Sequence, residues 1–173
     1  DFYLINVINK YLASQIKTNF PFRPTSEQEI SLEKLSDFIF SADDRAAFML
    51  CGYAGTGKTT LVSALVRTLL QLQRRVVLLA PTGRAAKVFS SYSGRGALTI
   101  HKCIYRQKSI MNNACFTLSD NRLRDALFIV DEASMIANGG MSGFGSGALL
   151  DDLVEFVYSG DGCRLLLLGD TAQ

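Results

Sequence analysis

Four short apolar runs recur along the chain, and each is followed by glycine or polar residues. They cover residues 47–51, 76–80, 126–130 and 164–168. The last three runs do not alternate with polar positions, which is typical of strands buried on both faces of a parallel sheet. Predicted helices lie between the runs, at 59–72, 83–90 and 148–158. This alternation predicts a three-layer α/β fold with a mostly parallel sheet and helices on both faces.

Two amphipathic helices are predicted before the first strand. The first covers residues 2–17, and its apolar face holds Leu4, Ile5, Ile8, Tyr11, Leu12 and Ile16. The second begins near Thr25 or Ser26, where Ser26 and Glu29 can form a capping box. Its apolar face consists of Ile30, Leu35, Phe38 and Ile39. We therefore expect a helical segment over 1–44 and a single domain over 45–173.

Composition favours a soluble, cytoplasmic protein without a membrane partner. Apolar residues make up 48% of the 173 residues, but no apolar run approaches the roughly 18 residues of a membrane span. The start of the chain does not have the lysine-led pattern of a signal peptide. The cysteines show neither a C-x-x-C pair nor metal-ligand spacing. Reduced thiols are expected at Cys51, Cys103, Cys115 and Cys163.

Charge is distributed unevenly along the chain, although the net charge is only +2. The segment 45–119 contains eleven of the 18 Lys and Arg residues and none of the 16 Asp and Glu residues. Such a basic segment favours a polyanionic partner. The alternative is a set of charges scattered over a solvated face.

The first apolar run leads into a glycine-rich segment that ends in a lysine and two threonines. The sequence Gly52-Tyr-Ala-Gly-Thr-Gly-Lys-Thr-Thr60 fits the Walker A pattern, and it lies between a predicted strand and a predicted helix. Its glycines allow backbone N–H groups to converge on phosphate oxygens. Lys58 would contact the β and γ phosphates of ATP, and the Thr59 hydroxyl would hold Mg2+. The alternative is a turn that only joins the strand to the helix. The predicted nucleotide-binding residues of this loop are Gly52, Ala54, Gly55, Thr56, Gly57, Lys58, Thr59 and Thr60.

Polar residues also follow two later strands. Asp131 and Glu132 come directly after the run 126–130, where Asp131 fits a Mg2+ ligand and Glu132 fits a base for the attacking water. The alternative is an acid pair that caps a helix. The last segment, 169–173, could sense the γ-phosphate, or it could be a surface turn. Because ligands of such sheets bind at the carboxyl ends of the strands, we expect these groups at one edge.

Five motifs, taken together, resemble motifs I, Ia, Ib, II and III of superfamily-1 DNA helicases, in particular the RecD-like branch. They are Gly52-Tyr-Ala-Gly-Thr-Gly-Lys-Thr59, Ala80-Pro-Thr-Gly-Arg-Ala-Ala86, Thr99-Ile-His101, Val130-Asp-Glu-Ala-Ser-Met135 and Gly169-Asp-Thr-Ala-Gln173. Pro24-Thr-Ser-Glu-Gln28 is similar to the Q motif of that family. The resemblance covers the chain from about Pro24 to its last residue.

The resemblance implies a RecA-like motor domain that uses ATP and Mg2+ and moves 5′ to 3′ on single-stranded DNA, in repair or recombination. It implies that Gln28 reads adenine and that Gln173 contacts the γ-phosphate. It also implies DNA contacts by Pro81, Thr82, Arg84 and His101, although a structural role is an equal alternative for His101. The strand that leads to Gly169 would lie between the P-loop strand and the Asp131 strand.

Two departures from the family pattern change what we expect. Only about twenty residues, 104–123, stand where the family often inserts a hairpin domain, so any strand-separating pin would be rudimentary. The second RecA-like domain, with its arginine fingers, does not appear in these 173 residues. We therefore expect the full-length protein to be the helicase and this chain alone to hydrolyse ATP very slowly, because an arginine finger contributes about 10^3 to 10^5 in rate. The sequence does not indicate whether the full-length protein joins the subunits of a nuclease complex.

Two other functions are weighed against the helicase. A PhoH-like P-loop ATPase acting on RNA shares the Ala-Gly-Thr-Gly-Lys-Thr loop, but the segments 80–86 and 99–101 favour the RecD-like interpretation. A non-catalytic nucleotide-binding scaffold is disfavoured by the intact Lys58, Thr59, Asp131 and Glu132.

The segment 138–147, with five glycines in ten residues, predicts a mobile loop on the nucleotide side of the sheet.

Overall fold

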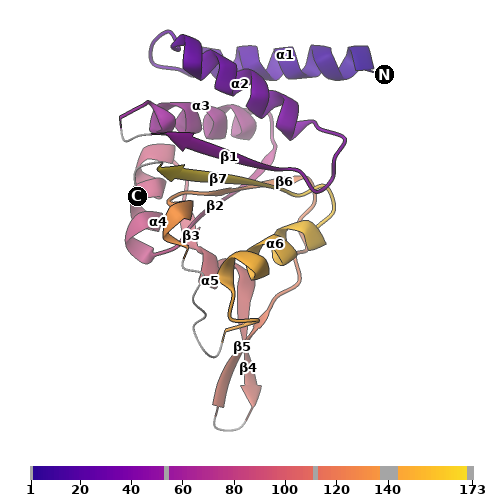
Figure 1. Cartoon of the computed structure of the whole chain (residues 1–173), viewed down its shortest axis with the longest axis vertical. Coiled ribbons are helices and arrows are strands. Elements are labelled where there is room, and N and C mark those ends of the chain that lie inside the picture. Colours follow the sequence, from indigo (N-terminus) through magenta and orange to yellow (C-terminus); the bar gives the residue numbers. More distant parts are fainter. Residues whose placement is uncertain (1, 53–54, 111–112, 137–143, 171–173) are drawn as a thin grey trace.

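A five-stranded parallel sheet forms the centre of the computed structural model, which describes residues 2–52, 55–110, 113–136 and 144–170. Its strands lie in the order β1-β7-β6-β2-β3 (Figure 1). This order confirms the predicted place of β7 between the P-loop strand and the Asp131 strand. The strands are β1 Ala47–Gly52, β2 Arg75–Ala80, β3 Ala97–Thr99, β6 Ala126–Val130 and β7 Arg164–Asp170.

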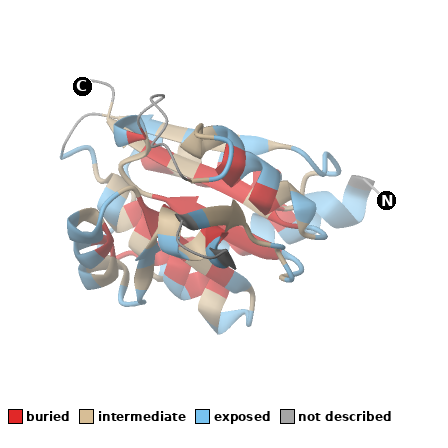
Figure 2. Ribbon diagram, turned by 90° about the horizontal axis from the view of Figure 1, so that it is seen from below, coloured by how far each residue is buried: buried red, intermediate tan, exposed pale blue. Residues whose placement is uncertain are grey.

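Helices cover both faces of the sheet, as predicted. One core cluster joins the sheet to α1, α2, α3 and α4, and a second joins it to α5 and α6. Buried residues accordingly gather in the strands and on the helix faces turned toward them (Figure 2). The helices are α1 Phe2–Thr18, α2 Ser26–Ile39, α3 Lys58–Gln71, α4 Gly83–Ser93, α5 Ile100–Ile104 and α6 Leu149–Ser159.

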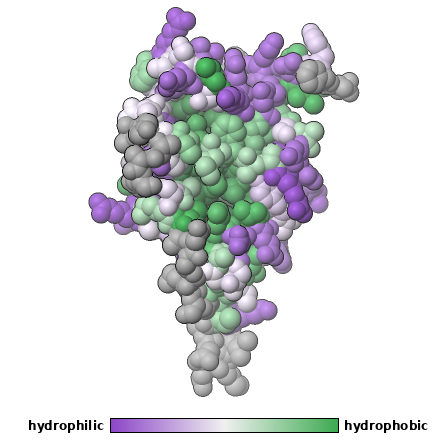
Figure 3. Space-filling model, viewed as in Figure 1, coloured by the Kyte–Doolittle hydropathy of each residue, from purple (hydrophilic) through white to green (hydrophobic). Residues whose placement is uncertain are grey.

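The two edges of the P-loop strand differ, because β7 pairs with one and no described strand pairs with the other. Side chains along β1 alternate between half-buried and exposed positions, and Met49 is 64% exposed. On this side of the molecule apolar residues gather over the strands (Figure 3). By contrast, every residue of β6 is buried, so the predicted two-sided burial holds for the middle of the sheet.

The predicted apolar face of the first helix is wrong in its first half. Leu4, Ile5, Ile8 and Tyr11 are exposed, whereas Leu12 and Ile16 are buried in the cluster shared with α2 and α3. The first turns of α1 project beyond α2 (Figure 1), which leaves them without a surface to cover. Helical periodicity marks a face that can be buried, but the neighbouring elements decide how much of it is covered.

The capping box of α2 is also corrected. It is formed by Thr25 and Gln28 and not by Ser26 and Glu29. Thr25 adopts the extended backbone of an N-cap residue, and its hydroxyl accepts a hydrogen bond from the Gln28 N–H at 3.3 Å. The predicted apolar face of this helix is wrong at one position, because Ile30 is 54% exposed and Leu32 is buried in its place.

Five elements between residues 97 and 135 were not assigned from the sequence. They are the short strand β3 with helix α5, the antiparallel hairpin of β4 (Tyr105–Ile110) and β5 (Asn113–Leu118), and the 3-10 turn η1 (Ala133–Met135). The hairpin extends away from the sheet at one end of the molecule (Figure 1). It occupies the place where the sequence predicted at most a rudimentary pin.

No helix in the described part of the chain is long and apolar enough to cross a membrane.

The predicted division of the chain at residue 44 stays a prediction. Ile16 of α1 and Leu35 of α2 lie in the same core cluster as Leu65 of α3. Most of the predicted loop 138–147 falls outside the described residues, which resume at Phe144.

Candidate nucleotide site

The P-loop lies between the end of β1 and the start of α3. Gly57 is the N-cap of α3, with φ of +82°, and Gly55 has φ of +83°. These left-handed angles favour glycine, and a side chain at position 57 would also collide with the amide of Gln28. The backbone can therefore approach a ligand closely at the N-terminus of a 14-residue helix, which favours anions. Ala54 lies outside the described residues.

Lys58 points across the carboxyl ends of β1 and β7. Its ammonium group donates to the carbonyl oxygen of Gly169 at 3.1 Å and to that of Gly52, and it forms an ion pair with Asp170. Gly52 and Asp170 are direct neighbours in the register of β1 with β7. Asp170 was not singled out from the sequence, because its closeness to Lys58 depends on the order of the strands.

The carboxylate of Asp131 is held through both of its oxygens. Oδ1 accepts from the Glu132 backbone N–H at 2.9 Å, and Oδ2 accepts from the Tyr92 hydroxyl at 2.7 Å. The backbone N–H of Asp131 itself donates to the Leu79 carbonyl oxygen at 2.9 Å. Asp131 is therefore fixed by three neighbouring segments at the carboxyl edge of the sheet.

Glu132 stands at the turn from β6 into η1, with φ of +55°. Burial raises the pKa of its carboxyl group above the usual value, and the charges of Asp131 and Asp170 raise it further, while Lys58 lowers it. A raised pKa brings a carboxylate closer to the range in which it can accept a proton from water. The geometry thus combines a carboxylate with a perturbed pKa and a nearby lysine at one edge.

Thr59 and Asp131 are the predicted metal ligands. Within the described ranges no group of three or more His, Cys, Asp or Glu side chains could hold a metal ion. Thr59 is exposed in the first turn of α3, one residue after Lys58. A hydroxyl and a carboxylate beside an anion-binding loop suit Mg2+, which usually keeps waters and phosphate oxygens among its ligands. The residues present fit Mg-ATP.

Gln28, the predicted adenine reader, is 7% exposed and contacts the P-loop backbone. Its Oε1 accepts from the Thr25 N–H at 3.0 Å, and its Nε2 donates to the Gly57 carbonyl oxygen at 3.3 Å. One side chain therefore caps α2 and also ties that helix to the loop. A pocket of about 310 Å3 lies beside this region and includes Thr59, Thr60, Phe20 and Pro21 in its lining.

The predicted DNA-binding residues lie at the start of α4 and on α5. Thr82 is the N-cap of α4, and its hydroxyl accepts from the Ala85 N–H at 3.2 Å. Pro81 precedes it and is half-buried, whereas Arg84 is exposed. His101 is half-buried on α5, with its ring centroid 5.6 Å from Tyr105 and 5.2 Å from Phe144. Gln173 lies outside the described residues.

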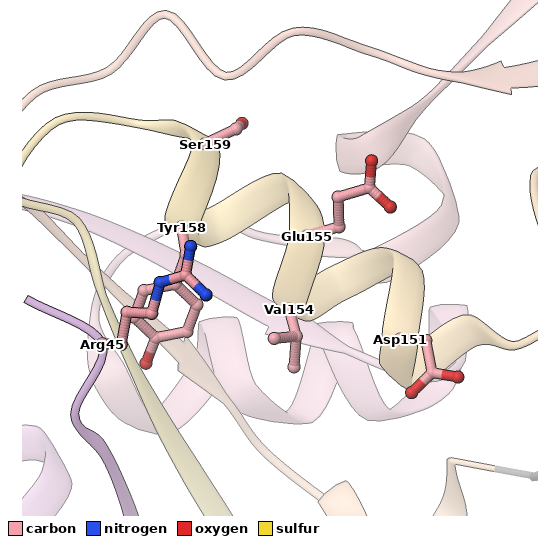
Figure 4. A pocket seen from close by; sticks show the side chains of 6 residues that line it. All are labelled: Arg45, Asp151, Val154, Glu155, Tyr158 and Ser159. Atoms are coloured by element: carbon pink, nitrogen blue, oxygen red, sulfur yellow. The ribbon is translucent and has the colours of Figure 1, made fainter.

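A larger pocket, of about 590 Å3, lies along α6 and contains none of the predicted site residues. Arg45 and Tyr158 line one end of it and Asp151 the other (Figure 4). Volume alone therefore does not identify the functional site in this molecule. The motifs gather at the carboxyl edge of the sheet, where the P-loop lies.

A family model described as an AAA domain matches residues 37–173. The chain belongs to this AAA-domain family. The match includes the P-loop, the Asp131 strand and β7. It therefore covers the whole sheet and both core clusters, apart from the contributions of residues before position 37.

Two related sequences extend the comparison. The ATP-dependent RecD2 DNA helicase of Deinococcus radiodurans is 35% identical over 129 residues, and the match covers 72% of this chain and 15% of that protein. An uncharacterized protein of Methanocaldococcus jannaschii is 27% identical over 148 residues, and the match covers 78% of this chain and 12% of that protein. The AAA-domain chain thus spans less than a sixth of either relative. The predicted resemblance to RecD-like helicases is confirmed.

Two solved structures share the fold. Pif1 of a Bacteroides species, in complex with ADP-AlF4, matches 86% of this chain and 32% of its own with a TM-score of 0.51 and 24% identity. Pif1 helicase of Candida albicans matches 88% of this chain and 33% of its own with a TM-score of 0.52 and 19% identity. The predicted P-loop α/β fold with a parallel sheet is confirmed.

Proposed function

We propose that this AAA-domain chain is the ATP-binding first motor domain of an ATP-dependent DNA helicase or translocase that moves 5′ to 3′ on single-stranded DNA. The observation that carries the proposal is the convergence of Lys58, Asp131 and Glu132 at one edge of the sheet. The name of the Deinococcus radiodurans relative, an ATP-dependent DNA helicase, supports the same activity. A role in DNA repair or recombination is part of the proposal.

In this function the P-loop backbone and Lys58 bind the phosphates, while Thr59 and Asp131 hold the metal. Bound Mg-ATP would supply the phosphoanhydride to be cleaved and a metal ion that offsets the charge of its phosphates. The Lys58 ammonium contacts Asp170 and two carbonyl oxygens. The anionic phosphates would compete with Asp170 for that ammonium.

Glu132 accepts a proton from the attacking water in the proposed mechanism. Its raised pKa, caused first by burial and then by the charges of Asp131 and Asp170, supports that role. Gln173 follows Asp170 by three residues, so the end of β7 supports its proposed contact with the γ-phosphate. Gln28 is proposed to read adenine from its position on Gly57.

Single-stranded DNA is proposed to bind along the N-terminus of α4 and the nearby α5. Arg84 is exposed there, and Thr82 orients the first turn of α4 by capping it. These residues lie in the segment 45–119, which contains no acidic residue. Phosphate contacts from such a segment would position the strand without reading its sequence. The proposed contacts are made by Pro81, Thr82, Arg84 and His101.

The full-length motor is proposed to need a second RecA-like domain, which would supply an arginine finger. The chain spans 15% of the RecD2 relative and about a third of each Pif1 chain, so the matched region corresponds to one part of those proteins. In this proposal residues 45–173 form the first motor domain, and residues 1–44 form a helical segment that precedes it.

Calorimetric titration with ATP and Mg2+ tests the nucleotide site. Lys58→Ala should weaken binding by about 10- to 100-fold, because hydrogen bonds to charged groups contribute about 1.5–3 kcal/mol and each 1.4 kcal/mol is about tenfold. Lys34→Ala removes an exposed lysine of α2 and should bind as the wild type does. Equal affinity of wild type and Lys58→Ala would contradict the proposal.

Fluorescence anisotropy with a labelled single strand tests the DNA surface. Affinity should fall steeply between about 50 and 200 mM salt, because counterions are released on binding. Arg84→Ala should weaken binding and reduce the salt slope by about one. Arg124→Ala, which removes an exposed arginine beside the start of β6, should change neither. Affinity independent of salt would rule out this surface.

A further inference from the structure

Tyr92 makes a contact that neither the motifs nor the proposed roles account for. It lies in the last turn of α4, and its hydroxyl donates to Asp131 Oδ2 at 2.7 Å. A tyrosine hydroxyl carries one proton to donate, and in this contact that proton points to the Asp131 carboxylate.

The position of Tyr92 is fixed from several sides. Its ring packs on Phe89, a fully buried residue, with centroids 5.2 Å apart. Its carbonyl oxygen accepts from the Ser63 hydroxyl of α3 at 2.8 Å. Two residues earlier, the Ser90 hydroxyl accepts at 2.8 Å from the Ala97 N–H at the start of β3. The phenol thus projects from a helix end that is attached to α3 and to the sheet.

This arrangement sets the orientation of the Asp131 carboxylate. Tyr92 occupies one lone pair of Oδ2, and the Glu132 N–H occupies one of Oδ1. Each carboxylate oxygen can accept a second contact, so both hydrogen bonds can persist while Asp131 also faces a metal ion or a metal-bound water. Partners that hold a metal ligand in this way strongly affect metal affinity.

We propose that Tyr92 is a positioning residue for the magnesium site, which acts by holding Asp131 in the orientation that receives the metal. The inference rests on the proposed ATPase function. It gives α4 a second role, because the helix that begins at the proposed DNA contacts Thr82 and Arg84 ends at the residue that orients Asp131. Tyr92 touches neither nucleotide nor metal in this proposal.

Tyr92→Phe tests the proposal, because it removes the hydroxyl and keeps the ring and the backbone contact with Ser63. The quantity to measure is the dissociation constant of a non-hydrolysable ATP analogue in EDTA divided by its dissociation constant in Mg2+. Tyr92→Phe should lower this ratio by about tenfold or more, in line with the effect of losing a partner of a metal ligand. The dissociation constant in EDTA should stay within about twofold of the wild-type value.

Two further variants separate positioning from a general structural effect. Tyr158→Phe removes a phenol whose hydrogen bond, to the Ala46 carbonyl oxygen, is 2.8 Å long and lies away from Asp131; it should leave the ratio unchanged. In an Asp131→Asn background, Tyr92→Phe should have little additional effect, because residues that act through one another are not additive. Far-ultraviolet circular dichroism confirms folding of each variant.

The outcomes distinguish this inference from the proposed function. A Tyr92→Phe ratio equal to the wild-type ratio would overturn the positioning role. A higher ratio would overturn it as well, since Tyr92 would then compete with the metal for Asp131. If the wild type bound no nucleotide in either solution, the proposed function would fail and the inference with it.

Discussion

Two tyrosine–aspartate hydrogen bonds of almost equal length lie in different surroundings. Tyr92 donates to Asp131 at 2.7 Å, and both residues are half-buried at the carboxyl edge of the sheet. Tyr105 donates to Asp152 at 2.6 Å, and these residues are only 8% and 2% exposed. The same chemical pair can therefore orient a carboxylate toward a ligand or lock two elements together.

The Tyr105–Asp152 pair fastens the hairpin to α6. Oδ2 of Asp152 also accepts from the Ser146 N–H at 3.1 Å, and a side chain at Gly145 would collide with this carboxylate. Beside it, Phe144 stacks on Phe116 of the hairpin with centroids 4.4 Å apart. Side chains fill the space around Asp152, whereas Asp131 keeps an approach from solvent. Burial, and not the hydrogen bond itself, separates a structural pair from one beside the proposed nucleotide site.

The largest effect is expected for Glu132, next to the more open pair. Glu132→Gln should slow the weak ATP hydrolysis proposed for this chain by about 10^2 to 10^4, the usual contribution of a general base. The free energy of unfolding should not fall, because the substitution removes a charge that lies close to Asp131 and Asp170. Single-turnover hydrolysis with excess protein measures the rate, and denaturant titration measures stability.

Glu155→Gln is the matched control for this prediction, because Glu155 is exposed on α6. It should change neither the rate nor the stability. Equal hydrolysis by wild type and Glu132→Gln would show that another group accepts the proton. A large loss of stability in Glu132→Gln would show that the nucleotide edge is a structural region like the base of the hairpin.

At Asp152, unlike at Glu132, substitution should lower the free energy of unfolding. Asp152→Ala leaves the Tyr105 hydroxyl and the Ser146 N–H without their acceptor, at a cost of about 1–3 kcal/mol for each unsatisfied group. We expect a loss of about 3 kcal/mol in the free energy of unfolding, measured by denaturant titration. Asp151→Ala, an exposed neighbour, should stay within about 0.5 kcal/mol of the wild type. A loss below about 1 kcal/mol in Asp152→Ala would contradict the structural role.

Sequence patterns predicted the parts of this fold that depend on local properties. The strands β1, β2, β6 and β7 and the helices α3, α4 and α6 lie close to their predicted ranges. The short strand β3 was missed, because three residues contain no periodicity and their strand character comes from pairing with β2. The exposed first half of α1 could not be foreseen, since periodicity does not reveal where the covering helix ends.

The residues of the candidate site also divide into those that local sequence predicted and those that only the fold brings together. Lys58, Asp131 and Glu132 belong to contiguous motifs whose spacing identifies them. Asp170 and Tyr92 act on those residues from positions 112 and 39 residues away along the chain. Their closeness depends on the strand order and on the placement of α4. Motif resemblance supplied the strand order in this case, but nothing in the sequence pointed to a phenol beside Asp131.

The smallest expected effect is the pH dependence of the buried pair. Burial raises the pKa of Asp152, but the hydrogen bonds from Ser146 and Tyr105 outweigh it, so the pKa lies below the usual value. The pKa of an aspartate in the unfolded chain is about 3.9. Just below this pH, Asp152 is protonated in the unfolded chain but still ionised in the folded chain. The stabilisation is therefore complete above that pH and is lost as the pH falls through the folded pKa.

Asp152→Asn should show a flatter decline of unfolding free energy below about pH 4, and Tyr105→Phe, which removes one of the hydrogen bonds, should be intermediate. If Asp152→Asn declined as steeply as the wild type, the acid sensitivity would belong to other carboxylates, and the contrast between the two pairs would rest on burial alone.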